Sequence, residues 1–216
     1  MAHNDQLEFI SDIKTLYPEF FVRKKILEVG SLDIQGSIRQ FFENCNYTGI
    51  DVSPGEGVDI VCEGQSFDAP DESFDVVVSC EVMEHNPFWR ETFSNMIRLC
   101  KPGGLILMTC ATKGRPEHGT TRSDVGSSPL TVQKGWEYYK NLSQKDFELA
   151  DLLADLNSYR FFYNWRHYDL YFIGFKSGGG CARTGQLSAL GRKYFRKNFL
   201  TYRGLRRFLK VVLLGK

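Results

Sequence analysis

The chain has 216 residues, of which 42% are hydrophobic and 25% are charged. This length suits one substantial hydrophobic core and is short for two full domains, and the composition is that of an ordinary globular protein. No apolar run approaches the roughly 20 residues that cross a bilayer, so the sequence predicts no membrane-spanning helix.

The N-terminus and the cysteines bear on location. The stretch MAHNDQLEF has neither the basic nor the apolar segment of a signal peptide. The six cysteines are scattered, and no two of them form a C-x-x-C pair. Both features favour a protein of the reducing cytoplasm.

The net charge of +1 conceals an uneven distribution along the chain. Ten of the 27 Lys and Arg residues follow Lys176, and no Asp or Glu lies among them. The preceding residues therefore carry 17 basic and 26 acidic side chains, a net charge of −9. We expect a domain over residues 1–177 and a basic C-terminal extension over 178–216, joined by a glycine hinge at 178–180.

Strands and helices are predicted to alternate over the first half of the chain. Apolar residues at near-helical spacing indicate a helix before Pro18, and Asn86-Pro87 is typical of a helix start. The predicted strands cover 25–30, 47–52, 58–62, 74–80 and 105–109, with helices over 37–43 and from 86 to about 97. Such alternation favours an α/β, Rossmann-like three-layer sandwich with a mostly parallel sheet.

The alternation stops after the fifth predicted strand. Residues 113–142 form a long polar segment, too long for a simple connection, and we interpret it as a lid or insertion. A helix is expected over 143–156. Two strands, 159–164 and 170–175, follow with a short link, which predicts an antiparallel hairpin and seven strands in all.

The stretch ILEVGSLDIQGS (26–37) reads as a strand, a tight turn and a helix start. A dinucleotide pyrophosphate needs glycines at three fixed positions of this turn, but the second and third positions hold Leu32 and Gln35. The carboxylate of Glu28 would repel a phosphate and attract a cation. These features exclude an NAD-dependent oxidoreductase.

Three motifs in the order seen here resemble those of the class I S-adenosylmethionine-dependent methyltransferases, in particular the type-11-like group. Glu28 and Gly30 match the acid-x-Gly start of the first motif, although Leu32 and Ile34 stand where glycines are usual. FDVVVSCEVMEH (74–85) resembles the fourth-strand signature, and IRLCKPGGLILMT (97–109) resembles the motif that follows. The resemblance covers about residues 20–176.

The resemblance implies that S-adenosylmethionine is the cofactor and S-adenosylhomocysteine the product. It assigns Asp51 to the ribose hydroxyls and places the adenine near residues 63–67. Acidic side chains near a sulfonium lower the free energy of holding it. The expected cofactor-binding residues are Glu28, Gly30, Ser31, Leu32, Asp51, Val52, Ser66, Phe67, Cys80 and Glu81.

Catalysis is expected at the end of the fourth strand. Methyl transfer is an in-line displacement that depends on alignment of the acceptor, and a base helps only when the acceptor is protonated. His85 is the favoured base or orienting group, with His118 on the loop after the fifth strand as the second candidate. The alternative is that His85 only caps the following helix or binds a backbone carbonyl.

A metal site is a further alternative. Glu81-x-x-Glu84-His85 is similar to the E-x-x-E-H arrangement with which some methyltransferases hold a divalent cation, and His118 would complete an O/N ligand set. Whether these four residues bind a metal stays unknown from the sequence.

The predicted lid supplies the candidate substrate-binding residues. Arg115 and Arg122 would bind a carboxylate or phosphate, and Trp136 and Tyr139 would stack on a sugar or cover a peptide. The lid has no aliphatic run, so we expect O-methylation of a hydroxyl or carboxylate on a polar glycan, sugar or peptide intermediate. The altered turn at Leu32 and Ile34 keeps open a catalytically silent S-adenosylmethionine-binding subunit that regulates a partner.

The basic extension has one predicted helical stripe with cations around it. The stripe contains Phe195, Phe199, Tyr202, Leu205, Leu209 and Val212. It could lie on an anionic membrane at its inner face, bind RNA, or dock on the acidic body of the same or another subunit, as in a homodimer. The opposite charges of body and tail slightly favour docking.

Overall fold

The computed structural model describes residues 4–34, 36–149, 151–179 and 184–214. Its seven-stranded sheet has the order β3-β2-β1-β4-β5-β7-β6. The strands are β1 (Lys25–Val29), β2 (Asn46–Asp51), β3 (Ile60–Val61), β4 (Phe74–Cys80), β5 (Cys100–Ala111), β6 (Leu156–Asn164) and β7 (Asp169–Lys176). Strands β1 to β5 pair in parallel, whereas β7 runs antiparallel to both β5 and β6. The predicted fold class is confirmed.

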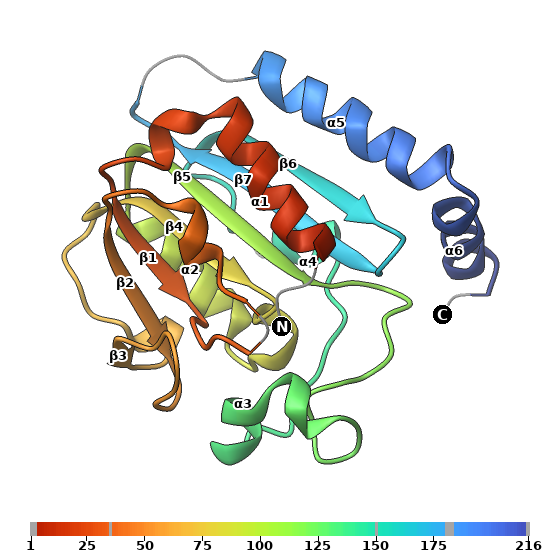
Figure 1. Cartoon of the computed structure of the whole chain (residues 1–216), viewed down its shortest axis with the longest axis horizontal. Coiled ribbons are helices and arrows are strands. Elements are labelled where there is room, and N and C mark those ends of the chain that lie inside the picture. The colour runs from red at the N-terminus through yellow and green to blue at the C-terminus, as the bar shows by residue number, and fades with distance from the viewer. Residues whose placement is uncertain (1–3, 35, 150, 180–183, 215–216) are drawn as a thin grey trace.

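Helices cover both faces of this sheet. They are α1 (Asn4–Leu16), α2 (Trp89–Leu99), α3 (Pro129–Gln133), α4 (Gln144–Leu149), α5 (Thr184–Phe199) and α6 (Tyr202–Leu214). In Figure 1, α1 and α5 cross the face turned toward the viewer, and α2 and α4 lie behind the sheet. The short α3 lies beyond one end of the strands, and α6 lies at the side.

Alternation along the strands fills two separate cores. Ile26 and Val76 belong to the cluster that packs under α1 and α5, while their neighbours Leu27 and Val77 belong to the cluster under α2 and α4. Successive side chains of a strand point to opposite faces, so a continuous apolar run such as Val76–Val78 is the pattern of a strand covered on both sides.

The sheet order creates a crevice at one edge. From β1 the chain moves to β2 and β3 on one side, and then returns to place β4 on the other side of β1. The carboxyl ends of β1 and β4 are therefore neighbours at the point where the strand order reverses. Ligands of open α/β sheets bind at such points.

Several predicted element boundaries were wrong, three of them by a clear margin. Residues 37–43 contain only the 3-10 helix η2 (Ile38–Phe41), and Asn44 then adopts a left-handed conformation with φ of 53°. The helix predicted over 143–156 ends at Leu149, because Asp151 has φ of 53° and Leu156 already pairs with Lys176 in the sheet. Strand β5 begins at Cys100, before the Pro-Gly-Gly that was expected to precede it.

The basic extension forms two helices instead of one continuous stripe. The first, α5, docks on α1: Lys193 Nζ lies 2.8 Å from Glu8 Oε1 and 2.7 Å from Asp12 Oδ2, and Lys197 Nζ lies 2.8 Å from Glu8 Oε2. The second, α6, packs Val211 against Trp165 and Tyr168. The acidic body and part of the basic tail thus pair within one chain.

The predicted hinge is only partly visible, since Gly180 lies outside the described residues. Among the helices of the described ranges, none combines the length and apolar character that crossing a membrane requires.

Candidate active site

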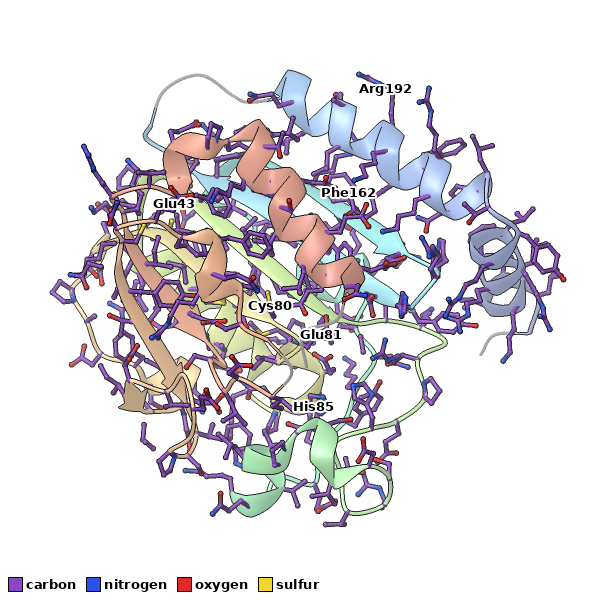
Figure 2. All side chains as sticks on the ribbon, viewed as in Figure 1. Glu43, Cys80, Glu81, His85, Phe162 and Arg192 are labelled. Atoms are coloured by element: carbon purple, nitrogen blue, oxygen red, sulfur yellow. The ribbon has the colours of Figure 1, made fainter. Side chains whose placement is uncertain are left out.

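A cavity opens at the carboxyl ends of β1, β2 and β4. Figure 2 shows Cys80, Glu81 and His85 following one another from the end of β4 toward α3. Of the predicted site residues, those that line the cavity are Glu28, Gly30, Ser31, Leu32, Asp51, Val52, Cys80, Glu81, His85 and Trp136. One cavity therefore brings together most of the predicted cofactor residues and one predicted catalytic histidine.

The turn after β1 depends on Gly30. Its φ is +79°, and a Cβ at this position would lie 2.0 Å from Val82 Cγ2, so only glycine fits without displacement. Its amide donates to the carbonyl of Ile50 over 2.8 Å and ties the turn to β2.

The departure from the usual glycine pattern has a local explanation. A Cβ added at Gly55 would lie 2.3 Å from Leu32 Cδ1, so the leucine side chain occupies the space that Gly55 leaves free. The Leu32 amide donates to Asp51 Oδ2 over 3.1 Å. The turn accommodates leucine because a neighbouring loop supplies the glycine.

Glu28 is the buried acid of the site. It is 5% exposed and accepts a 2.7 Å hydrogen bond from the Tyr47 hydroxyl. Burial raises the pKa of Glu28 to about 7, an effect that the Tyr47 hydrogen bond partly offsets. A cation in the cavity would favour the ionised carboxylate.

Asp51 holds backbone amides while keeping acceptor capacity. Oδ1 accepts from the Val52 amide over 2.7 Å and Oδ2 from the Leu32 amide. Each carboxylate oxygen can accept a second hydrogen bond. The side chain is therefore able to bind a pair of neighbouring hydroxyls, as predicted for a ribose.

The predicted adenine residues lie elsewhere. Ser66 is exposed, and Phe67 packs toward the core with its ring centroid 6.4 Å from that of Phe74. Cys62 and Gly64 line the cavity in their place.

Sequence reasoning also missed residues from distant segments. Gln6 of α1, Ile34, Ile38 and residues 128–131 at α3 line the cavity. The one local signal was the polar character of the 113–142 segment. Gln6 is a buried polar residue in an otherwise amphipathic helix, and nothing near it in the sequence indicates a site.

Two loops bring the predicted histidines together. The His85 and His118 ring centroids are 4.9 Å apart, and the ring of Tyr139 lies 5.5 Å from His85 and 5.0 Å from His118. Burial, followed by the neighbouring His118, lowers the pKa of His85 to about 3, and burial also lowers the pKa of His118. Both rings are neutral at pH 7.

The loop that carries His118 covers the imidazole of His85. Gly119 has φ of +67°, and a Cβ there would lie 2.6 Å from His85 Cε1. Its amide donates to the Asp124 carbonyl over 2.8 Å. Glycine is thus required for this close approach to the histidine.

A metal could be held by part of the predicted set. Ligand atoms of Glu84, His85 and His118 lie within 4.8 Å of one another, while Glu81 is on the cavity wall. Burial, and next the charge of Glu81, raises the pKa of Glu84 to about 8. Within the described ranges, Glu84 Oε2 and His85 Nδ1 are buried without a hydrogen-bond partner. Carboxylate and imidazole donors of this kind suit a divalent cation.

The predicted substrate residues divide into two groups. Trp136 lines the cavity and Tyr139 lies beside the histidines. Arg115 instead donates to the His167 carbonyl over 2.7 Å and to Asp169 over 3.1 Å, away from the cavity. Arg122 is held on the surface by Glu117 and Glu137. Arg115 is bound by residues far away in the sequence, and Arg122 is bound by two acids of its own 113–142 segment.

Comparison with known proteins gives a family and a fold. Residues 1–171 match the model of a family described as a methyltransferase domain. A comparison with curated proteins gives no match.

Solved structures share the fold at low sequence identity. Phosphoethanolamine N-methyltransferase 2 of Haemonchus contortus, in complex with phosphomonomethylethanolamine and S-adenosylhomocysteine, has a TM-score of 0.58 and 14% identity, covering 81% of this chain and 53% of its own. This chain thus spans about half the length of that enzyme. The 1,6-didemethyltoxoflavin-N1-methyltransferase of Burkholderia thailandensis has a TM-score of 0.52 and 14% identity, covering 78% and 77%. A Haloferax volcanii methyltransferase in complex with the activator Trm112 has a TM-score of 0.52 and 14% identity, covering 81% and 95%.

Proposed function

Because the chain belongs to a family described as a methyltransferase domain, we propose that it is an S-adenosylmethionine-dependent methyltransferase and that it methylates an oxygen of a polar biosynthetic intermediate. The acceptor would be a hydroxyl or carboxylate of a glycan, a sugar or a peptide. The observation that carries this proposal is the single cavity that Glu28, Gly30 and Asp51 share with His85 and Trp136.

The cofactor would occupy the part of the cavity nearest β1 and β2. Asp51 would accept hydrogen bonds from the ribose hydroxyls, and the turn at Gly30 would allow close approach of the methionine part. Glu28 would provide negative charge near the cationic end of the molecule. Its pKa near neutrality makes this charge responsive to a bound cation.

The protein would contribute mainly alignment. In methyl transfer the acceptor oxygen forms a bond to the methyl carbon while the bond from carbon to sulfur breaks, and sulfur leaves as a neutral thioether. Holding the acceptor in line behind the methyl group can be worth about 7–11 kcal/mol. The cavity supports this role because the residues proposed to bind the methyl donor and those proposed to contact the methyl acceptor line the same cavity.

His85 would orient the acceptor more than it would take its proton. A general base works best when its pKa lies near the operating pH, and the pKa of His85 is about 3. As a neutral imidazole it offers one acceptor and one donor nitrogen, which suit a hydroxyl or a carboxylate oxygen. A carboxylate acceptor is already ionised and needs no base.

The lid supports a polar acceptor. Where it lines the cavity it presents the hydroxyl residues Ser127, Ser128 and Thr131 and the aromatic Trp136, together with the apolar Pro129 and Leu130. Hydroxyls next to an aromatic face are suited to a sugar or to the backbone of a peptide.

The test is product analysis. The protein is incubated with methyl-deuterated S-adenosylmethionine and fractions of glycan, sugar and peptide intermediates, and products are examined by mass spectrometry. We expect one acceptor to gain one labelled methyl group on oxygen. A label on nitrogen or carbon would contradict the proposal.

A catalytically silent subunit is the second candidate. One neighbour by fold, the Haloferax volcanii methyltransferase, is seen in complex with a separate activator protein, so a protein of this fold can be one part of a complex. Tight binding of S-adenosylhomocysteine without turnover of any fraction would favour it. Turnover by the isolated chain would eliminate it.

A further inference from the structure

The outward face of α6 is apolar and uncovered within the described ranges. Its inward face packs Val211 and Phe208 toward Trp165. On the opposite side, side chains that are 40–81% exposed form a continuous stripe along the helix. The residues of this stripe are Tyr202, Leu205, Leu209, Val212 and Leu213.

Cations border this stripe on one side. Arg203, Arg206 and Lys210 are exposed and line a groove that α6 forms with Arg115 and Tyr168. No carboxylate of the described residues forms an ion pair with these three side chains. By contrast, Lys193 and Lys197 of α5 are paired with acids of α1. Arg203, Arg206 and Lys210 therefore have no ion-pair partner among the described residues of their own chain, whereas Arg115 of the same groove is paired with Asp169.

The combination identifies the kind of partner. An aliphatic stripe next to unpaired cations is complementary to a surface with anionic headgroups above hydrocarbon. A nucleic acid would satisfy the cations, but its bases stack on aromatic rings, and Tyr202 is the one aromatic residue of the stripe. A second copy of the chain would offer α1 acids that already bind α5.

We propose that α6 lies on an anionic lipid surface, with Arg203, Arg206 and Lys210 among the headgroup phosphates and Leu209, Val212 and Leu213 among the acyl chains. Binding of this kind is peripheral. It depends on α6 alone and does not require that the proposed methyl transfer is correct.

The lipid surface would lie next to the histidine pair. Arg115 and Pro116 line the groove, and the Pro116 carbonyl accepts from the Tyr139 hydroxyl over 3.2 Å and lies 3.1 Å from His118 Nδ1. A polar acceptor carried on a lipid could then reach the cavity from the membrane surface.

Vesicle co-sedimentation of the full chain tests the proposal. Vesicles of phosphatidylcholine alone are compared with vesicles that also contain phosphatidylglycerol, each at low and high salt. We expect binding to the anionic vesicles that weakens with salt. Replacing Arg206→Gln together with Lys210→Gln should lower the partition coefficient about 30-fold, because each cation near the surface contributes about one factor of five.

Two further variants separate the contributions. Leu209→Ser with Val212→Ser should lower binding at both salt concentrations, because the apolar contribution is not screened. Arg90→Gln with Lys145→Gln removes two exposed cations from α2 and α4, on the sheet face opposite α1 and α5, and should leave binding unchanged. Circular dichroism and thermal unfolding confirm that each variant is folded.

Three results would overturn the proposal. The first is absence of binding to anionic vesicles, and the second is an equal loss in the Arg90/Lys145 control. The third is tight binding to single-stranded RNA that the Arg206/Lys210 variant loses and the Leu209/Val212 variant keeps, which would assign the groove to nucleic acid.

Discussion

Burial sets the protonation of the side chains around the cavity. It raises the pKa of Glu28 to about 7 and that of Glu84 to about 8, and it lowers the pKa of His85 to about 3. Each shift disfavours the charged form, as expected for groups removed from water. At pH 7 His85 is therefore neutral and Glu84 is mostly protonated, and Glu28 is poised between its two forms.

Glu28 should link cofactor affinity to pH. A sulfonium favours the ionised carboxylate, so the affinity for S-adenosylmethionine should rise roughly tenfold between pH 6 and pH 8. The stability of the free protein should change with pH in the opposite direction to the cofactor affinity. Folded Glu28 stays protonated above its ordinary pKa of 4.5, so its contribution to the free energy of unfolding falls as pH rises from 4.5 to about 7. Titration calorimetry at several pH values measures the affinity.

The matched variant is Glu28→Gln, which keeps the size of the side chain and removes its titration. Its affinity should be nearly independent of pH. The neutral thioether product should also show a weaker pH dependence than the donor. An identical slope for wild type and variant would exclude Glu28 as the group that senses the cofactor.

Asp51 should contribute directly to cofactor affinity. We expect Asp51→Ala to weaken binding by about 1–3 kcal/mol, the range for losing hydrogen-bond partners in a buried site. Asp68→Ala, an exposed acid outside the cavity, serves as the control and should bind normally. An unchanged dissociation constant for Asp51→Ala would remove this residue from the site.

His85 should act on turnover and not on cofactor binding. His85→Ala is expected to lower kcat while leaving the dissociation constant of the cofactor nearly unchanged, and His167→Ala, near the tip of the β6–β7 hairpin, is the control. Protonation of His85 should cause no fall in kcat between pH 8 and pH 5, because its pKa is about 3.

Treatment with a chelator distinguishes a role of the His85 imidazole alone from the role of a metal bound at the same place. If His85 orients the acceptor by itself, EDTA should leave kcat unchanged. A divalent cation held by Glu84, His85 and His118 would supply charge that acidifies a bound hydroxyl. A loss of activity with EDTA that added Mg²⁺ or Mn²⁺ restores would reassign the three residues to a metal site.

At the scale of elements, the turn after β1 couples three parts of the fold. Its glycine lies against Val82, its amide binds β2, and the next residues form the cavity wall. We expect Gly30→Ala to lower the free energy of unfolding by about 2–5 kcal/mol, the sum of left-handed strain and overpacking. Chemical denaturation measures the change.

Gly135→Ala is the matched control for this substitution. Its φ is +84°, yet no atom lies within 4 Å of the added methyl group. It should therefore lose only the strain contribution, about 1–2 kcal/mol. Equal losses at the two positions would mean that contact with Val82 does not matter.

An element could be predicted from the sequence when its own residues carry the pattern that determines it, and not when distant contacts determine it. Strand β4 matched its predicted bounds because a fully buried strand carries its signal in its own apolar run. The helix predicted after Ser143 was too long, since a left-handed Asp151 and the pairing of Leu156 with β7 end it. Those causes are tertiary and leave no clear local pattern.

At the scale of the whole molecule, the charge distribution predicted part of the packing of the C-terminal extension. The complementary charges of body and extension favoured docking, and α5 does pair with α1. Charge alone could not show that the extension divides into two helices and that α6 keeps its cations unpaired. That division depends on the packing of Val211 against the tip of the hairpin.

In the candidate site too, contacts between residues far apart in the sequence could not be predicted. Glu28, Gly30 and Asp51 were accessible to prediction because they match the motifs of a known family at the ends of two consecutive strands. Arg115 was assigned to a substrate because arginines on a polar loop suit an anion, but Asp169, 54 positions away, binds it. Gln6 enters the cavity from the far end of the sequence and carried no signal.

The most direct test of the account is a crystal structure of the chain with S-adenosylmethionine or S-adenosylhomocysteine. We predict that the ligand lies beside Glu28 and Gly30, with its ribose hydroxyls on Asp51 and its sulfur facing His85. Ligand density in any other cavity, or a ribose that does not contact Asp51, would contradict the central claim that the turn after β1 holds the methyl donor.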